Sequence, residues 1–294
     1  MLELHGVTKS YGGRRVLDGV GFRVTGGALT GFVGGNGAGK TTTMRIALGV
    51  LAADGGSVLL DGAPVSRDDR RRFGYMPEER GLYPKMKVGE HIAYLARLHG
   101  YGKTDAARQA NDLLERLGLG ERLGDNIETL SLGNQQRAQI AAALVHDPEV
   151  LILDEPFSGL DPLAVDVVAG VLHERAQRGA AVLFSSHQLD VVERLCDELV
   201  IIAGGTIRAA GTRAELRAQH EAHRFELVSA TDAGWLRGEP GVTVVEFAGG
   251  HAVFDVDDNQ TAQRVLRRAV ELGDVATFTA QHPSLAQIFK EVVK

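Results

Sequence analysis

Apolar and polar positions alternate over residues 2–7 and again over 16–24. A period of two is typical of β-strands with one buried face, so we predict two strands joined by a turn at Tyr11-Gly12-Gly13. The apolar stretch 28–33 then leads through a glycine-rich turn into a helical pattern over 40–50. The N-terminal part of the chain is therefore predicted to be an antiparallel β subdomain followed by a strand, a loop and a helix.

The pattern changes to a helical period between about residues 84 and 145. Apolar residues recur here at spacings of three and four, as at Ile92, Leu95 and Leu98, which predicts a helical insert. Strands and helices alternate after this insert, and this order is typical of a mostly parallel sheet covered by helices on both faces. The predicted strands span 150–153, 180–185 and 198–203, and the predicted helices span 163–177 and 189–196.

The composition shifts after about Leu216, where shorter alternating segments begin. The predicted elements are strands at 225–228, 243–247, 252–256 and 275–279, a helix at 262–272, and a closing helix opened by Pro283 and Ser284. We therefore predict two domains. An α/β domain covers 1–215 and contains a helical subdomain at about 84–145, and a small accessory α+β domain covers 221–294.

Charge and composition narrow the class of protein. Hydrophobic residues make up 44% of the 294 residues and charged residues 24%, which is ordinary for a globular protein with a real core. The net charge of -6 argues against a nucleic-acid partner, because phosphate backbones are bound mainly by clustered Lys and Arg. The basic run over 67–72 is interrupted by Asp68 and Asp69, so we interpret it as a solvated face.

The single cysteine, Cys196, cannot form an internal disulfide, and this fits a reduced, cytoplasmic setting. Glu3 and Lys9 interrupt the N-terminal segment, so we expect no secretory signal there. No run of about 18 consecutive apolar residues predicts a membrane-spanning helix. If the protein serves a membrane, another chain is expected to supply the pore.

Residues 34–41 fit the pattern G-x-x-x-x-G-K-[ST] of a phosphate-binding loop. Glycines let the backbone turn its N–H groups toward phosphates, and the positive end of the following helix adds to the attraction. Lys40 is expected to neutralise phosphate charge, and the Thr41 hydroxyl is expected to ligate Mg²⁺. The alternative is a glycine-rich turn without a ligand, but a strand before it and a helix after it favour the nucleotide site.

The apolar strand at 150–153 ends in two adjacent acids, Asp154 and Glu155. Buried unpaired charge is costly, so adjacent carboxylates at this place indicate a function. We predict that Asp154 holds Mg²⁺ through its water shell and that Glu155 is the general base for the attacking water. The alternative is that both acids cap the next helix.

Residues 130–134, Leu-Ser-Leu-Gly-Asn, resemble the LSGGQ signature of the ATP-binding cassette (ABC) family. The resemblance implies a P-loop NTPase core in which Ser131, Gly133 and Asn134 contact ATP held by a second subunit. The helical pattern that follows supports this, because a helix N-terminus attracts anions. The expected assembly is therefore a dimer, either of this chain or with another cassette.

Other family landmarks follow in order over residues 1 to about 215. Tyr11 matches the aromatic residue that stacks on adenine, with a core or turn tyrosine as the alternative, and 158–161 resembles the segment that links the two active sites. His187 matches the histidine that contacts the γ-phosphate. The implied catalytic residues are Glu155, His187 and Lys40. The implied ATP-binding residues are Tyr11, Val16, Asn36, Gly37, Ala38, Gly39, Lys40, Thr41, Thr42, Ser131, Gly133 and Asn134, and the implied metal ligands are Thr41, Asp154 and Glu78.

Leu132 and Asn134 depart from the usual signature, and Glu78 stands where the family usually has glutamine. The acidic residue and the stretch after it resemble a subgroup of bacterial exporter cassettes related to sodium- and drug-efflux ATPases. The C-terminal extension, ending in a motif similar to 283–289, resembles theirs as well.

The resemblance implies an Mg-ATP-hydrolysing subunit that powers export through a separate transmembrane permease, at the inner face of the membrane. One alternative is a non-transport cassette acting on ribosomes or DNA. The single cassette and the 91 positions between Lys40 and Ser131 speak against it, because such proteins usually carry two cassettes or a long coiled coil there. Another alternative is a catalytically weak regulatory cassette, which Glu78, Leu132 and Asn134 leave open.

Overall fold

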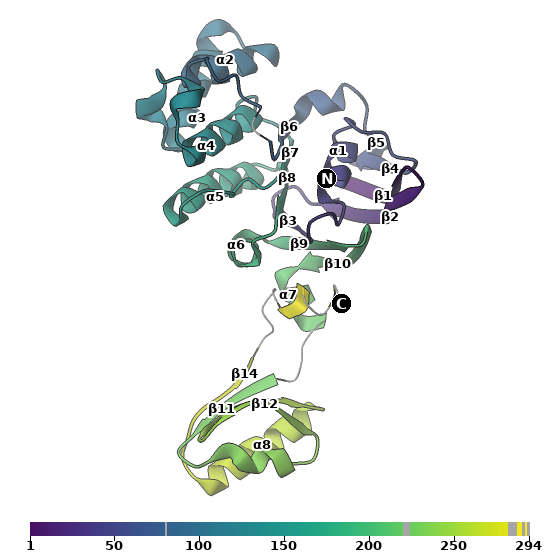
Figure 1. The fold of residues 1–294 in the computed structure, drawn as a ribbon, viewed down its shortest axis with the longest axis vertical. Coiled ribbons are helices and arrows are strands. Elements are labelled where there is room, and N and C mark those ends of the chain that lie inside the picture. The colour runs from purple at the N-terminus through teal and green to yellow at the C-terminus, as the bar shows by residue number, and fades with distance from the viewer. Residues whose placement is uncertain (80, 220–223, 282–286, 290–291, 293–294) are drawn as a thin grey trace. The chain divides into compact units, whose positions relative to one another are not determined.

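The computed structural model describes residues 1–79, 81–219, 224–281, 287–289 and 292. The chain divides into two compact units, one formed by Met1–Arg213 and the other beginning at Ala214 (Figure 1). Within the described part of the chain, none of the helices has the length and apolar character needed to cross a membrane.

The first unit begins with an antiparallel sheet of order β2-β1-β4-β5. Its strands are β1 (Leu2–Tyr11), β2 (Arg14–Val24), β4 (Gly55–Leu60) and β5 (Ala63–Pro64). Leu2 pairs with Val24 and Leu4 with Phe22, so the apolar side chains of both strands share one buried face. β1 and β2 extend further than predicted, up to the turn at Gly12-Gly13, because backbone pairing continues there regardless of side-chain polarity.

A six-stranded sheet of order β10-β9-β3-β8-β7-β6 forms the centre of the first unit. Its strands are β3 (Leu29–Val33), β6 (Phe73–Met76), β7 (Val150–Leu153), β8 (Ala181–Ser186), β9 (Glu198–Ala203) and β10 (Thr206–Thr212). The five strands other than β10 pair in parallel, and β10 is antiparallel to β9. The predicted α/β class with a mostly parallel sheet is confirmed.

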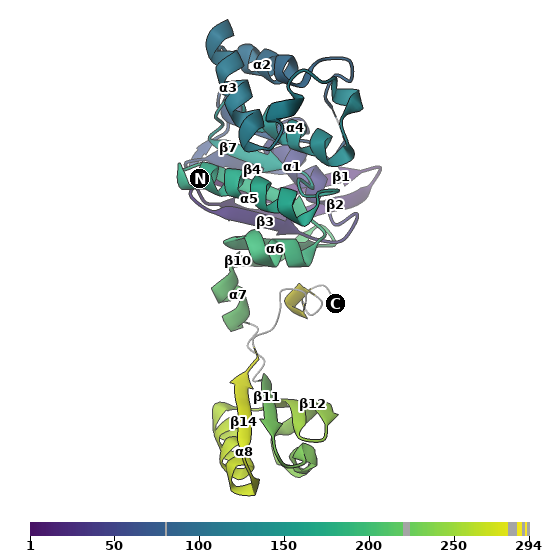
Figure 2. The same cartoon turned by 90° about the vertical axis from the view of Figure 1, so that its left-hand side faces the viewer.

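Helices cover both faces of this central sheet. α5 (Pro162–Gln177) and α6 (Leu189–Leu195) pack against β3 and β8 on one face, which Figure 2 turns toward the viewer. α1 (Lys40–Ala47) lies on the other face, where Met44 joins Phe32 and Ile152 in a core shared with the antiparallel sheet. α1 ends earlier than the predicted 40–50, because Gly49 takes a left-handed φ of 71°.

The helical insert consists of three helices, α2 (Val88–Leu98), α3 (Lys103–Arg116) and α4 (Leu132–Leu144). Short 3₁₀ turns at Gly120–Arg122 and Ile127–Thr129 connect α3 to α4, and another at Asp69–Arg72 precedes β6. The predicted helical stretch is interrupted at Gly100 and Gly118, where φ is 94° and 72°. α4 begins where the Ser131 hydroxyl accepts a hydrogen bond from the Asn134 N–H.

The second unit contains α7 (Arg213–Gln219) and a four-stranded antiparallel sheet of order β12-β13-β11-β14. Its strands are β11 (Arg224–Ser229), β12 (Val242–Ala248), β13 (His251–Val256) and β14 (Val275–Ala280), with a 3₁₀ turn at Ala233–Gly238. Helix α8 (Asn259–Leu272) buries Val265 against Leu227 and Phe254 of the sheet. α8 begins earlier than predicted because the Asp258 carboxylate caps it.

Pro283 and Ser284, which were predicted to open a closing helix, lie outside the described residues, and 287–289 are helical. The helix predicted over 189–196 ends one residue early, because Cys196 is in an extended conformation. The Cys196 thiol is buried over β3, and a Cβ at Gly31 would lie only 2.5 Å from its Sγ.

Candidate functional site

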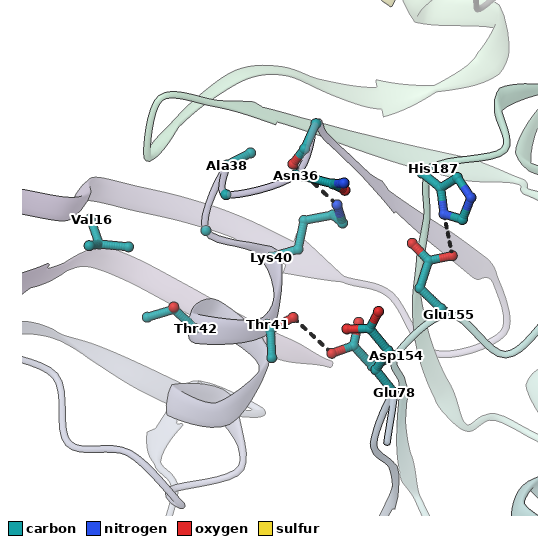
Figure 3. Close-up of a pocket in the computed structure, with 13 residues that line it drawn as sticks. Val16, Asn36, Ala38, Lys40, Thr41, Thr42, Glu78, Asp154, Glu155 and His187 are labelled. Atoms are coloured by element: carbon teal, nitrogen blue, oxygen red, sulfur yellow. Dashed lines mark hydrogen bonds and ion pairs between the residues drawn. The ribbon is translucent and has the colours of Figure 1, made fainter. Parts of the chain in front are cut away.

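A cavity of about 440 Å³ lies between the loop that follows β3 and the ends of β6, β7 and β8 (Figure 3). Five residues from outside the loop line it together with the loop itself. The lining residues are Val16, Gly35, Asn36, Gly37, Ala38, Gly39, Lys40, Thr41, Thr42, Glu78, Asp154, Glu155 and His187. The structure therefore brings together residues from five separate stretches of the sequence.

Glycines shape the loop between β3 and α1. Gly37 and Gly39 have φ of 76° and 109°, a region that other residues rarely adopt. A Cβ on Gly39 would also lie 2.5 Å from Cδ2 of Leu17, and a Cβ on Gly34 would lie 2.5 Å from the Ile202 carbonyl oxygen. The loop then enters α1, whose N-terminus carries partial positive charge that favours an anion.

The first residues of α1 place a cation and a hydroxyl in the cavity. Lys40 Nζ donates to the Gly34 carbonyl at 2.7 Å and to the Gly35 carbonyl at 3.4 Å, so the ammonium lies over the loop. Thr41 Oγ1 donates to Asp154 Oδ2 at 2.9 Å. The lysine and the threonine thus face the same cavity in which the two acids after β7 lie.

The paired acids after β7 differ in side-chain exposure and in backbone conformation. Asp154 is 1% exposed, and its N–H donates to the Met76 carbonyl at 2.8 Å. Glu155 has a φ of 52°, and a non-glycine residue in this region is strained, as residues at functional sites often are. Its Oε2 lies 2.9 Å from Nδ1 of His187, whose ring is largely exposed to the cavity.

Ser185, at the end of β8, supports both acids. Its hydroxyl donates to Asp154 Oδ1 at 2.5 Å and accepts from the Glu155 N–H at 2.9 Å. The side chain is fully buried. The sequence predicts a strand that ends at this serine but indicates no role for it.

Two buried glutamines of α4 also contact the loops of the site. Gln136 Nε2 donates to the Glu155 carbonyl at 2.9 Å, and Gln139 Nε2 donates to the Pro77 carbonyl at 2.7 Å. Sequence reasoning missed both residues. No signal in the sequence marked them, because their burial follows only from the packing of α4.

The loop after β6 carries Glu78, whose exposed side chain lines the cavity together with Asp154. Burial raises the pKa of the neighbouring Tyr75 phenol, while a hydrogen bond with Arg45 of α1 acts in the opposite direction. Thr41, Asp154 and Glu78 together offer only oxygen donors, the ligands that Mg²⁺ prefers. Because Mg²⁺ in nucleotide sites keeps few protein ligands and takes the rest from phosphates and water, this small donor set fits the ion.

Tyr11, Ser131, Gly133 and Asn134 are not among the residues that line the cavity. Tyr11 is 49% exposed, and its ring centroid lies 5.6 Å from Nζ of Lys9. Ser131, Gly133 and Asn134 lie at the N-terminus of α4 in the helical insert. A role for these four residues in ATP binding stays a prediction, and for the three on α4 it requires a second subunit.

Comparison with known proteins gives consistent matches. Residues 17–158 match the ABC transporter family, and residues 211–293 match the C-terminal domain of DrrA1-3-like ATP-binding proteins. The chain is 36% identical to the uncharacterized ABC transporter ATP-binding protein YhaQ of Bacillus subtilis (strain 168), over 100% of this chain and 98% of that protein.

Two further similarities extend this finding. The Nod factor export ATP-binding protein I of Paraburkholderia xenovorans (strain LB400) is 35% identical, over 92% of this chain and 91% of that protein. A solved structure titled as the ATP binding subunit of an ABC transporter is 33% identical, with a TM-score of 0.69, and the match covers 74% of this chain and 92% of that one.

Proposed function

Because the chain belongs to the ABC transporter ATP-binding subunits, a family of ATPases, we propose that it hydrolyses Mg-ATP to drive export through a separate transmembrane permease. One observation carries the proposal: a single cavity contains the phosphate loop, the Thr41–Asp154 pair and the Glu155–His187 pair. The names of the Nod factor export protein and of the linearmycin resistance ATP-binding protein LnrL, 34% identical over 74% of this chain, support export as the direction.

The loop and Lys40 bind the phosphates in this proposal. Loop N–H groups and the N-terminus of α1 face the β- and γ-phosphates, and the Lys40 ammonium exchanges the Gly34 and Gly35 carbonyls for phosphate oxygens. Thr41 and Asp154 would hold Mg²⁺, and the bound ion would supply positive charge that offsets the charge of the phosphates.

Glu155 is the proposed general base. The oxygen of a water molecule bonds to the γ-phosphorus, the bond to the bridging β–γ oxygen breaks, and Glu155 takes the proton of the water as ADP and phosphate form. His187, 2.9 Å from the carboxylate, orients it in this proposal and contacts the γ-phosphate. The intact Glu155–His187 pair argues against a catalytically weak regulatory cassette.

We assign Glu78 to the metal end of the site. Its carboxylate repels the phosphates when no metal is present, and it joins the ligands or water shell of Mg²⁺ when the ion is bound. ATP affinity should therefore depend on Mg²⁺ more steeply in this chain than in its Glu78→Gln variant.

The proposed assembly is a dimer bound to a permease at the inner face of the membrane. Ser131, Gly133 and Asn134 do not line the cavity of their own chain, so a complete site requires the α4 N-terminus of a second subunit. That end is suited to an anion, because a helix N-terminus carries partial positive charge.

Glu155→Gln tests the chemical proposal. We expect hydrolysis to fall by roughly 10²–10⁴-fold, because the amide cannot accept the proton, while ATP binding measured by calorimetry is retained. Lys40→Ala is the comparison, since it should weaken ATP binding itself. Near-normal turnover by Glu155→Gln would show that another residue is the base.

A further inference from the structure

Helix α4 holds the backbone on both sides of Glu78. The Gln139 side chain, 3% exposed, uses both of its amide hydrogens for this. Nε2 donates to the Pro77 carbonyl at 2.7 Å and to the Glu79 carbonyl at 3.1 Å. The two accepting residues are the neighbours of Glu78 in the chain, so one buried amide spans the residue whose exposed carboxylate lines the cavity.

The segment before Glu78 is held just as closely. A Cβ on Gly74 of β6 would lie 2.2 Å from the Ala143 carbonyl oxygen, so α4 packs directly on the backbone of that strand one turn after Gln139. The Met76 carbonyl accepts from the Asp154 N–H at 2.8 Å. The backbone from β6 to Glu79 is therefore fixed against α4 on one side and the end of β7 on the other.

Both contacts of Gln139 require hydrogen-bond donors. Its NH₂ group provides two donors on one nitrogen, whereas a glutamate of the same shape provides acceptors and a methionine provides neither. Loss of the amide would leave two carbonyls of the Glu78 loop without these partners, and the loop would relax.

We propose that Gln139 is a positioning residue that keeps the Glu78 carboxylate at the metal end of the nucleotide cavity and so sets how strongly ATP binding depends on Mg²⁺. The proposal rests on the function assigned to Glu78 above. When the loop relaxes, the Glu78 carboxylate moves away from the phosphates, and its repulsion of metal-free nucleotide falls. The gain in nucleotide affinity on adding Mg²⁺ is then smaller.

The test is the ratio of two dissociation constants of the full chain for AMP-PNP, a non-hydrolysable ATP analogue. Calorimetry gives one value in EDTA and one in excess Mg²⁺, and the ratio is the value in EDTA divided by the value in excess Mg²⁺. The measurement does not depend on ATP hydrolysis. We expect Gln139→Met to lower the ratio by about tenfold, the usual scale for the loss of an outer-shell partner of a metal site. Gln139→Asn, one methylene too short to reach both carbonyls, should lower it in the same direction.

Gln135→Met is the matched control. Gln135 lies on the same helix and also donates from Nε2 to two carbonyls, those of Ile127 at 3.2 Å and Leu130 at 3.1 Å, but neither belongs to the cavity. Its loss should leave the ratio at the parent value. An equal drop in Gln135→Met and Gln139→Met would overturn the proposal, because the effect would then be a general loosening of α4.

The Glu78→Gln background separates this inference from the function on which it rests. Glu78→Gln alone should lower the ratio, and adding Gln139→Met should lower it no further. If Glu78→Gln lowers the ratio and Gln139→Met does not, the positioning role is wrong and the role of Glu78 stands. If neither variant lowers the ratio, the positioning role of Gln139 and the role of Glu78 are both wrong. A further drop in the double variant would place the effect of Gln139 elsewhere and overturn the proposal.

Discussion

Ser185 is the residue on which both acids of the site depend, since one hydroxyl bonds Asp154 Oδ1 and the Glu155 N–H. In Ser185→Ala the buried N–H of Glu155 loses its partner, and an unsatisfied buried donor costs about 1–3 kcal/mol of the free energy of unfolding. The strained Glu155 backbone also loses its support. We therefore expect lower stability in urea unfolding together with a roughly 10- to 100-fold loss of ATP hydrolysis.

Thr30→Val is the control for this prediction. Thr30 is a fully buried hydroxyl of β3 that donates to Glu198 at 3.3 Å and does not line the cavity. Its loss should lower stability without a comparable loss of hydrolysis. Equal losses of hydrolysis in the two variants would mean that Ser185 acts only through stability.

At the scale of elements, two histidines at the C-terminal ends of α2 and α4 contact each other. The rings of His99 and His146 stack with centroids 3.7 Å apart, and His146 Nε2 donates to the Phe73 carbonyl of β6 at 3.1 Å. Burial, followed by the charge of His99, lowers the pKa of His146 from its ordinary 6.5 to about 4. His146 is therefore neutral in the folded protein at neutral pH.

The lowered pKa predicts how stability changes with pH. Between pH 6.5 and about 4 the unfolded chain binds a proton at His146 that the folded chain does not bind. The contribution of His146 to the free energy of unfolding is therefore fully present above pH 6.5 and is lost as the pH falls toward 4. In His146→Gln, urea midpoints should fall less steeply over this window than in the parent. An unchanged slope in His146→Gln would contradict this prediction.

At the scale of the whole molecule, the absence of the α4 N-terminus from the lining of its own cavity predicts ATP-dependent dimerisation. Light scattering of Glu155→Gln with Mg-ATP should report a mass of two chains, because hydrolysis no longer releases the dimer. Ser131→Arg in the same background should bind ATP and stay monomeric, since Ser131 does not line the cavity of its own chain. A monomer in the parent Glu155→Gln chain would argue against the homodimer.

Each unit has its own hydrophobic cluster among the described residues, one with members from Leu2 to Ile202 and one with members from Leu227 to Ala269. We therefore propose that the C-terminal domain regulates or dimerises and does not catalyse. A chain that ends at Arg213 should fold by circular dichroism and bind ATP with the parent affinity. A folded truncated chain that fails to bind nucleotide would contradict this assignment.

Local patterns of the sequence determined much of the fold and the chemistry of the site. The strands at 150–153 and 198–203 were predicted to the residue, because residues 150–153 and 199–203 are continuous apolar runs bounded by acids or by glycine. Lys40, Thr41, Asp154 and Glu155 were recognised because each belongs to a motif of adjacent residues. Strands β4, β5, β6 and β10 were missed, since their short or mixed sequences become strands only by pairing with neighbouring strands.

The tertiary structure alone decided which residues support those motifs. The Ser185 hydroxyl reaches Asp154 across 31 positions, and the Gln139 amide reaches Pro77 across 62. No local pattern encodes such contacts, because a hydrogen bond requires distance and direction in space, and these are set by the order of the parallel strands and the packing of α4 on β6. The sequence by itself determined that this chain has the groups of a nucleotide site, and the fold decided how each group is held.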